Sequence, residues 1–125
     1  MGSTLNISIS THQGDDKLTG TVTVLSLKGE LDSSTYKDLQ AKADEIINED
    51  TKNILIDMSG LNFIGSAGLR AIHTTSNSTK EKGGSVKLLK PSEASHRVLK
   101  TLGFDEFFEI FQDLDKAIES FKQVH

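Results

Sequence analysis

The sequence predicts an α/β domain in which a mixed, mostly parallel sheet carries an antiparallel hairpin at its N-terminal end and packs against about four helices. Two observations support this class. Segments with the alternating pattern of strands are followed in turn by segments with helical spacing, an order typical of parallel sheets with right-handed crossovers. The first two strand segments, in contrast, follow one another without a helix between them. The length of 125 residues fits a single domain, which we expect to span residues 1–125.

The N-terminal hairpin is predicted from two apolar segments separated by turn residues. In residues 5–9, leucine and isoleucine alternate with polar residues, which indicates a strand with one buried face. Gly14-Asp15-Asp16 supplies the turn. The second segment, residues 22–31, has apolar residues in both phases, as is typical of a strand covered on both faces. Its two phases are formed by Val22 and Val24, and by Leu25, Leu27 and Leu31.

The helices are predicted from capping residues and apolar spacing. Several N-cap candidates lie between Asp32 and Thr35, before a helix that ends near Asn48. A second helix begins at about Ser66 and stops at Gly83-Gly84. The last two helices begin at Ser92 and Asp113 and carry Val98, Leu99 and Leu102, and Leu114, Ala117, Ile118 and Phe121, respectively.

Three more strands are expected between these helices. The apolar run 54–56 is too short for a helix and ends at Asp57, and residues 86–89 form a similar run. The phenylalanine-rich segment 107–111 is predicted as the last short strand. Phe107 and Phe108 would then point to opposite sides, so one of them is a candidate exposed aromatic contact.

The composition argues against several classes of function. The chain has no cysteine, so it offers no disulfide, no thiolate nucleophile and no cysteine-based metal site. No apolar run approaches the ~18 residues of a membrane-spanning helix, and no signal-peptide pattern opens the sequence. The net charge of -4 comes from interspersed charges, so nothing indicates binding to nucleic acid or anionic lipid. We expect a cytoplasmic protein without membrane insertion.

Residues 53–72 form the most informative segment, because they predict a buried strand, a short loop and a serine at the start of an amphipathic helix. In open α/β sheets, functional surface gathers beyond the carboxyl ends of the strands. Residues 29–32 follow the second strand, and residues 59–66 follow the third. If these strands are neighbours, Asp32 and Ser66 lie at one edge of the molecule.

Several short motifs together resemble one family. The third strand ends in Ile56-Asp57-Met58-Ser59, and Phe63-Ile64-Gly65-Ser66-Ala67-Gly68-Leu69 opens the next helix. Gly29-Glu30-Leu31-Asp32 follows the second strand, and Leu102-Gly103-Phe104 precedes the aromatic segment 107–111. With these motifs, nearly the whole chain resembles the STAS domain family, of the anti-sigma factor antagonist type. That family commonly has aspartate directly before the motif serine, where this chain has Gly65.

The resemblance implies a protein-binding regulatory module. By position, Ser66 corresponds to the serine that family members present to a partner kinase, which implies that it is the phosphoacceptor. The implied partners are an anti-sigma factor, usually a serine kinase, and a serine phosphatase that resets the switch. The unmodified domain would capture the anti-sigma factor, and phosphorylation would release it. The expected partner surface consists of Glu30, Asp32, Asp57, Asn62, Ile64, Gly65, Ser66, Leu69 and Arg70.

Each candidate also has a purely structural interpretation. Ser66, Asp32 and Asp57 are residue types that commonly cap helices or orient loops. The glycines near Ser66 fit loop and packing roles, since the Lys-Ser/Thr pair of a phosphate-binding loop is missing after them. The four histidines lack metal-ligand spacing, and His73 lies about 10 Å along the helix from Ser66, too far for its general base. We therefore expect no catalytic residue, no metal and no cofactor.

Two other functions stay open. One is an adaptor subunit of another STAS-containing assembly, such as a lipid-transport ATPase complex or a stress-signalling scaffold, without a phosphorylation switch. The other is a small enzyme or nucleotide-binding protein, which turnover or retention of Mg-ATP would reveal.

Overall fold

The computed structural model describes residues 2–13, 21–48, 51 and 53–121. They contain a five-stranded sheet of order β1-β2-β3-β4-β5, in which β1 and β2 pair antiparallel and the other neighbours pair parallel. The predicted mixed, mostly parallel sheet with an N-terminal hairpin is therefore confirmed, whereas the turn predicted at Gly14-Asp15-Asp16 lies outside the described residues. The strands are β1 (Leu5–Gln13), β2 (Thr21–Leu31), β3 (Asn53–Ile64), β4 (Ser85–Leu89) and β5 (Ile110–Phe111).

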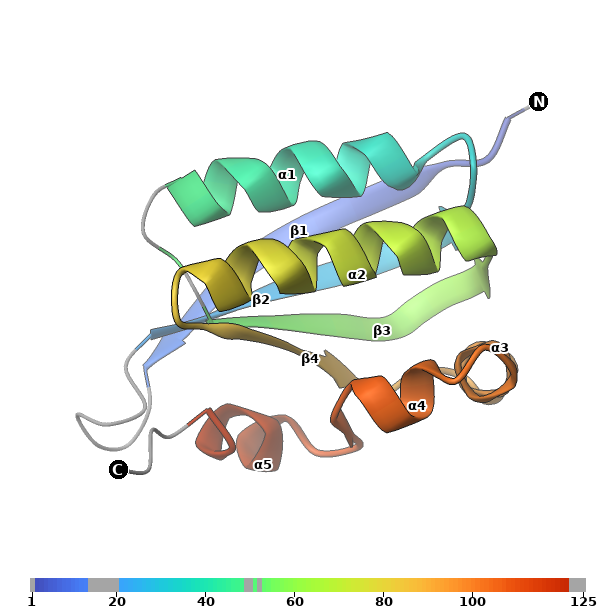
Figure 1. Ribbon diagram of the computed structural model, residues 1–125. Helices are drawn as coiled ribbons and strands as arrows, with labels where there is room; N and C mark the ends of the chain where they lie inside the picture. The colour runs from blue at the N-terminus through green and yellow to red at the C-terminus, as the bar shows by residue number, and fades with distance from the viewer. Residues whose placement is uncertain (1, 14–20, 49–50, 52, 122–125) are drawn as a thin grey trace.

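Five helices pack against this sheet in the described part of the chain. Figure 1 shows α1 and α2 side by side over one face of the sheet and α5 on the opposite side. Three predicted helix boundaries are confirmed, since the side chains of Ser92 and Asp113 cap α3 and α5, and Gly83 (φ 82°) follows the end of α2. The helices are α1 (Tyr36–Asn48), α2 (Ser66–Glu81), α3 (Glu93–Thr101), α4 (Phe104–Phe107) and α5 (Leu114–Glu119).

The core has one part on each face of the sheet, and β2 contributes to both. Its leucines at 25, 27 and 31 belong to the main cluster, together with buried residues of α1 and α2. Its valines at 22 and 24 belong to a smaller cluster with residues of α5. The prediction that β2 is covered on both faces is confirmed. In β1, Leu5 and Ile7 pack against the main cluster, but Ile9 is 46% exposed, so only part of its apolar face is covered.

The segment after α3 differs from the prediction. The sequence pattern predicts a strand over 107–111, but α4 extends through Phe107 and β5 contains only Ile110 and Phe111. Gly103, in the left-handed region at φ 79°, permits a new turn in which the Phe108 N–H donates to the Phe104 carbonyl (2.9 Å). This turn buries Phe108 and leaves Phe107 45% exposed. Leu102, carried by the preceding helix, is exposed as well.

Candidate functional site

The carboxyl ends of β2 and β3 meet at one edge of the sheet. Leu31 pairs with Ile64 at the end of the parallel register, and the Gly65 N–H donates to the Leu31 carbonyl (2.9 Å). The next residues, Asp32 after β2 and Ser66 at the start of α2, are therefore brought to the same edge. The prediction that these two residues lie at one edge is confirmed.

Close packing of the first turn of α2 against β2 fixes the position of Ser66. A Cβ atom added to Gly68 would lie 2.5 Å from Leu31 Cγ and 2.9 Å from the Leu31 carbonyl oxygen. Both distances are shorter than van der Waals contact, and Leu31 is fully buried. Glycine at position 68 thus allows the helix to start directly over the end of β2.

The Ser66 side chain is exposed at the first helical position of α2. The N-cap residue is Gly65, and no side chain caps this helix. The Ser66 hydroxyl has no hydrogen-bond partner among the described residues, so the alternative role as a helix cap is not observed. A solvent-facing hydroxyl without a structural task is free to be modified.

The Asp32 carboxylate organises the turn that precedes α1. Its oxygens accept hydrogen bonds from the Ser34 N–H (2.9 Å) and hydroxyl (2.8 Å), the Thr35 hydroxyl (3.4 Å) and the Ser3 hydroxyl. These donors, the Ser3 hydroxyl above all, lower the pKa of Asp32 from 3.8 to about 2. Asp32 is not the N-cap of a helix that starts at residue 33, because α1 begins only at Tyr36. It presents a permanent negative charge beside the start of α2.

Two predicted contact residues lie in the core. Ile64 is 2% exposed and Leu69 is fully buried, and both belong to the main hydrophobic cluster. Neither side chain is accessible to a partner, so including them in the surface was wrong. The physical reason is that the apolar phase of β3 and the inward face of α2 both point toward the sheet core at this edge.

The prediction that β3 ends at Asp57 is also wrong. β3 continues to Ile64, and Asp57 pairs within the sheet with Ser26 on β2 and Leu89 on β4. Its carboxylate accepts the Ser59 N–H (3.0 Å) where the register of β2 and β3 shifts. Asp57 therefore shapes an irregular part of the strand and lies several residues before the edge that carries Ser66.

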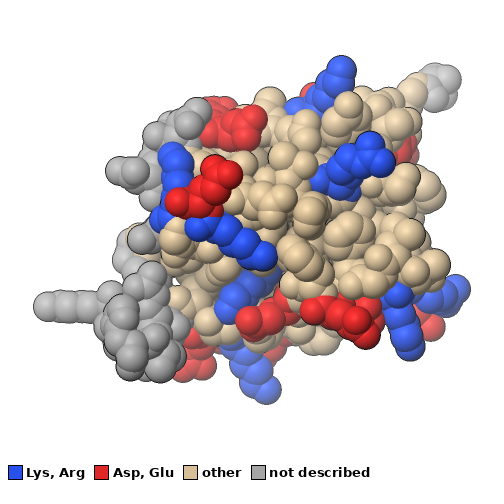
Figure 2. Space-filling view, in the orientation of Figure 1, with Lys and Arg blue, Asp and Glu red and all other residues tan. Residues whose placement is uncertain are grey.

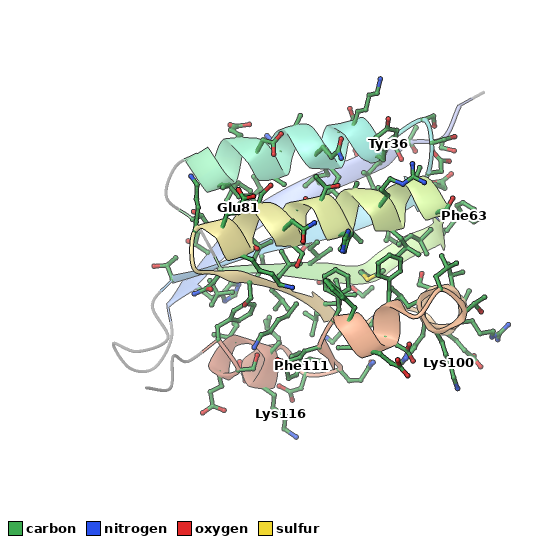
Figure 3. The ribbon with its side chains drawn as sticks, viewed as in Figure 1. Tyr36, Phe63, Glu81, Lys100, Phe111 and Lys116 are labelled. Carbon is green, nitrogen blue, oxygen red and sulfur yellow. The ribbon has the colours of Figure 1, made fainter. Side chains whose placement is uncertain are left out.

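Two exposed apolar side chains lie next to Ser66. The sequence did not predict either of them as a contact residue. Phe63 is 53% exposed and pairs with Glu30 across the strands, and its ring is the nearest group to a Cβ added at Gly65 (3.3 Å). Leu102 is 50% exposed. Figure 3 shows Phe63 at the same end of the molecule as the start of α2. Local alternation could not reveal Phe63, because the shifted register interrupts the phase of β3.

Arg70 lines two grooves, one on each side of α2. The first, of about 320 Å³, is lined by Ser66, Arg70, His73, Leu102 and Phe104. The second, of about 360 Å³, lies between α1 and α2 and is lined by Ser33, Tyr36, Gln40, Ala67, Arg70, Ala71 and Thr74. Figure 2 shows a broad uncharged area on this face, with charged side chains around it.

We call the exposed and half-buried residues of this edge the docking rim. It contains six residues predicted from sequence and two apolar residues recognised from the fold. It comprises Glu30, Asp32, Asn62, Phe63, Gly65, Ser66, Arg70 and Leu102. Among the described residues no cluster of metal-binding side chains is found, and no helix is long and apolar enough to cross a membrane.

The family follows from a comparison with known proteins, in which the model of the STAS domain family matches residues 15–117. The chain belongs to the STAS domain family. Among curated proteins, this STAS domain is 28% identical to the anti-sigma-F factor antagonist RsfB of Mycobacterium tuberculosis strain H37Rv over 116 residues. That match covers 91% of this chain and 87% of RsfB.

Solved structures show the same fold. The crystal structure of an anti-sigma factor antagonist from Mycobacterium paratuberculosis superposes with a TM-score of 0.79 at 24% identity, and the match covers 94% of this chain and 93% of that one. The antagonist SpoIIAA in its unphosphorylated form has a TM-score of 0.76 at 20% identity, with 92% and 95% covered. SpoIIAA of Bacillus in its phosphorylated form has a TM-score of 0.64, with 90% and 98% covered.

Proposed function

We propose that this STAS domain is an anti-sigma factor antagonist that captures an anti-sigma factor with serine kinase activity on the docking rim. Phosphorylation of Ser66 by that kinase would end the complex, and a serine phosphatase would restore it. The observation that carries the proposal is the exposed, unbonded Ser66 hydroxyl beside Asp32 and two exposed apolar side chains. The names of its relatives, and a phosphorylated form of SpoIIAA, support it.

Phosphorylation would change the electrostatics of the rim more than its shape. A phosphate on Ser66 adds about -1.5 to -2 charge at neutral pH. In the free domain, the backbone N–H groups at the start of α2 would stabilise this charge. Arg70 follows Ser66 by four residues and lines the same groove, so its guanidinium is within range of a phosphate at that position. The modified free domain would therefore stay folded.

A docked partner would experience the same phosphate differently. Closure of an interface over Ser66 would remove water from a group that lies near the permanent charge of Asp32. A buried charge without a full set of partners costs several kcal/mol, and about 1.4 kcal/mol already changes affinity tenfold. The switch therefore needs no conformational change in the domain.

We also propose that the domain performs no chemistry of its own and that ATP is bound by the kinase. The nearest general-base candidate on α2, His73, packs against the rings of Phe107 (4.9 Å between centroids) and Phe104 (6.0 Å). These contacts support a packing role for His73. Incubation of the isolated domain with Mg-ATP should then give neither turnover nor retained nucleotide.

Modification is tested by incubating the chain with a candidate anti-sigma kinase from the same genome and Mg-ATP, followed by mass spectrometry. We expect one phosphate on Ser66 and none on the Ser66→Ala variant. A phosphate on another residue, or none in the presence of a kinase that binds the domain, would contradict the switch.

Binding is tested with charge variants on α2. Ser66→Asp should weaken the complex with the kinase by at least about tenfold, since it places a charge inside the interface. Asn77→Asp is the matched control, because it adds the same charge to an exposed position about 16 Å further along the helix. Equal affinity of the wild type and Ser66→Asp, measured by calorimetry, would refute the docking position.

A second candidate function is that of an adaptor without a phosphorylation switch. Gly65 favours it, because the first turn of α2 has no acidic residue where the family commonly has aspartate before the serine. The two functions differ in one readout. An adaptor would bind its partner with the same affinity before and after incubation with kinase and ATP.

A further inference from the structure

The sheet has a free edge at β1 (Figure 1). β1 pairs with β2 over Leu5–Gln13, and no strand pairs with its other side in the part of the chain that the structure describes. Residues 8–11 are all exposed. A free edge presents a row of unpaired backbone N–H and C=O groups, which can pair with a further strand.

This edge lacks the devices that normally prevent such pairing. Proteins protect edges with charged side chains, proline, bulges or very short strands. Residues 5–13 contain no Asp, Glu, Lys, Arg or Pro. The pairing with β2 runs through nine residues without a shift of register. The edge is therefore long, regular and uncharged.

The backbone groups that face outward can be assigned. The Thr4 carbonyl accepts the Glu30 N–H (2.9 Å), and antiparallel strands bond to one neighbour at every second residue. The backbone N–H and C=O groups of Leu5, Ile7, Ile9, Thr11 and Gln13 consequently point away from β2. Ile9 is the central residue of the strand and carries an exposed apolar side chain (46%).

We propose that β1 pairs with β1 of a second copy of this chain, in antiparallel register about a two-fold axis at Ile9. In this register Ile9 lies opposite Ile9 of the other copy, and Ile7 lies opposite Thr11. The residues whose backbone groups point outward then pair with one another and form up to about ten hydrogen bonds. The two Ile9 side chains lie on the same face and bury each other, and no like charges meet. The two five-stranded sheets become continuous.

A second copy fits this edge better than an unrelated strand because the edge is complementary to itself. The exposed isoleucine lies at the centre of the strand, where a two-fold axis brings the two copies of one residue together. The pairing residues do not belong to the docking rim, so the dimer leaves two copies of the rim accessible. The inference is independent of the proposed function.

The mass in solution tests the dimer. Sedimentation equilibrium of the full chain across the micromolar to millimolar range should show a rise from the mass of one chain toward twice that mass. Ile9→Lys and Ile9→Glu should each stay at the mass of one chain, because like charges would meet at the axis. An equimolar mixture of the two variants should regain the double mass, since opposite charges then face each other. Circular dichroism checks that both variants are folded.

Disulfide crosslinking tests the register. The chain contains no cysteine, so Ile9→Cys provides a single thiol. The Cα atoms of such a directly opposed pair are about 5.5 Å apart, within the range that a disulfide spans. In Thr11→Cys, the matched control, the two thiols are offset by four residues, about 13 Å along the strands. With oxidised glutathione, Ile9→Cys should crosslink at least about tenfold faster than the control.

Several results would overturn the proposal. They are a wild type that keeps the mass of one chain at millimolar concentration, a mixture of charge variants that stays monomeric, and equal crosslinking of the two cysteine variants. Doubling of the mass that survives Ile9→Lys would assign the dimer to another surface and would also refute pairing at β1.

Discussion

At the scale of single residues, Asp32 carries a negative charge of the docking rim that the folded chain stabilises. Four hydrogen bonds from side chains and backbone stabilise its ionised form and hold its pKa at about 2. A carboxyl group whose pKa is lowered by folding contributes stability above its unfolded pKa and loses this contribution as the pH falls through its folded pKa. Its negative charge is thus constant at and around neutral pH.

We predict that Asp32→Asn lowers the free energy of unfolding by an amount that is constant from neutral pH down to about pH 4. Between about pH 4 and pH 2, the difference between wild type and variant should shrink. Urea denaturation at a series of pH values measures it. Ser3→Ala should raise the pKa of Asp32, because the Ser3 hydroxyl is the largest cause of the shift. An NMR titration in which Asp32 has a pKa near 3.8 in the wild type would contradict this account.

Gly68 is the residue at which a single methyl group has the clearest cost. We predict that Gly68→Ala destabilises the protein by about 1–3 kcal/mol, since the new Cβ meets the backbone oxygen and buried side chain of Leu31. This outweighs the gain of up to about 1 kcal/mol in helix propensity.

Gly65→Asp is the informative comparison for Gly68→Ala. At φ -109° the backbone of Gly65 suits any residue, and the nearest obstacle is the exposed ring of Phe63, which can move aside. An N-cap carboxylate at this position should leave stability unchanged or raise it by a few tenths of a kcal/mol. Chemical denaturation of both variants checks the contrast, and a stabilised Gly68→Ala would show that α2 can shift away from β2.

At the scale of elements, the segment from α3 to β5 shows how one aromatic sequence supports α2. His73 of α2 lies against Phe107 of α4, whose ring packs edge-on against Phe108 (4.9 Å between centroids), and the Lys80 Nζ lies 4.4 Å from the centre of the Phe107 ring. Phe108 enters the main core, whereas Phe107 covers the outer side of this contact. The two neighbouring phenylalanines therefore have different tasks.

We predict that Phe108→Ala costs about 3–5 kcal/mol of stability, as expected for removal of a buried ring. Phe107→Ala should cost only about 1 kcal/mol, close to the value of one aromatic pair. Thermal and urea denaturation of the two variants measure the difference. Equal costs would contradict the burial of Phe108 and the exposure of Phe107.

At the scale of the whole molecule, the two faces of the sheet are covered differently. One face carries α1 and α2 over the main core, and the other carries the short α5 over a smaller cluster. The C-terminal part is joined to the sheet by Lys87 of β4, a buried cation. Its Nζ donates to the Ser120 carbonyl (2.7 Å) and hydroxyl (3.0 Å) and lies 4.7 Å from the centre of the Phe121 ring. These contacts add polar and cation–π interactions to the smaller apolar cluster under α5.

The two proposed surfaces lie on different parts of the sheet. The docking rim lies where β2 and β3 end, while the free edge lies along β1. Because α2 packs over β3 and β4, whereas β1 lies at the edge of the sheet beyond β2, a second copy at β1 and a partner at Ser66 could bind together. A dimer would then present two rims, and a dimeric partner would gain from the high effective concentration of the second site.

Local sequence patterns were sufficient for the order of the elements apart from α4. They were also sufficient for the hairpin, the two phases of β2, the caps at Ser92 and Asp113 and the position of Ser66. These features depend on alternation, helical spacing and turn chemistry, all of which act over short stretches of chain. Even the meeting of Asp32 and Ser66 could be predicted, because parallel neighbouring strands end at one edge.

Pairing and packing between distant segments determined the rest. The extension of β3 past Asp57 depends on its bonds to β2, and the burial of Ile64 and Leu69 depends on how α2 sits over Leu31. The exposure of Phe63 follows from a register shift between two strands, and the rings of Phe104 and Phe107 pack against His73 of α2. Local patterns cannot specify such contacts, since each one joins side chains that are far apart in the chain and is decided by the free energy of the whole core.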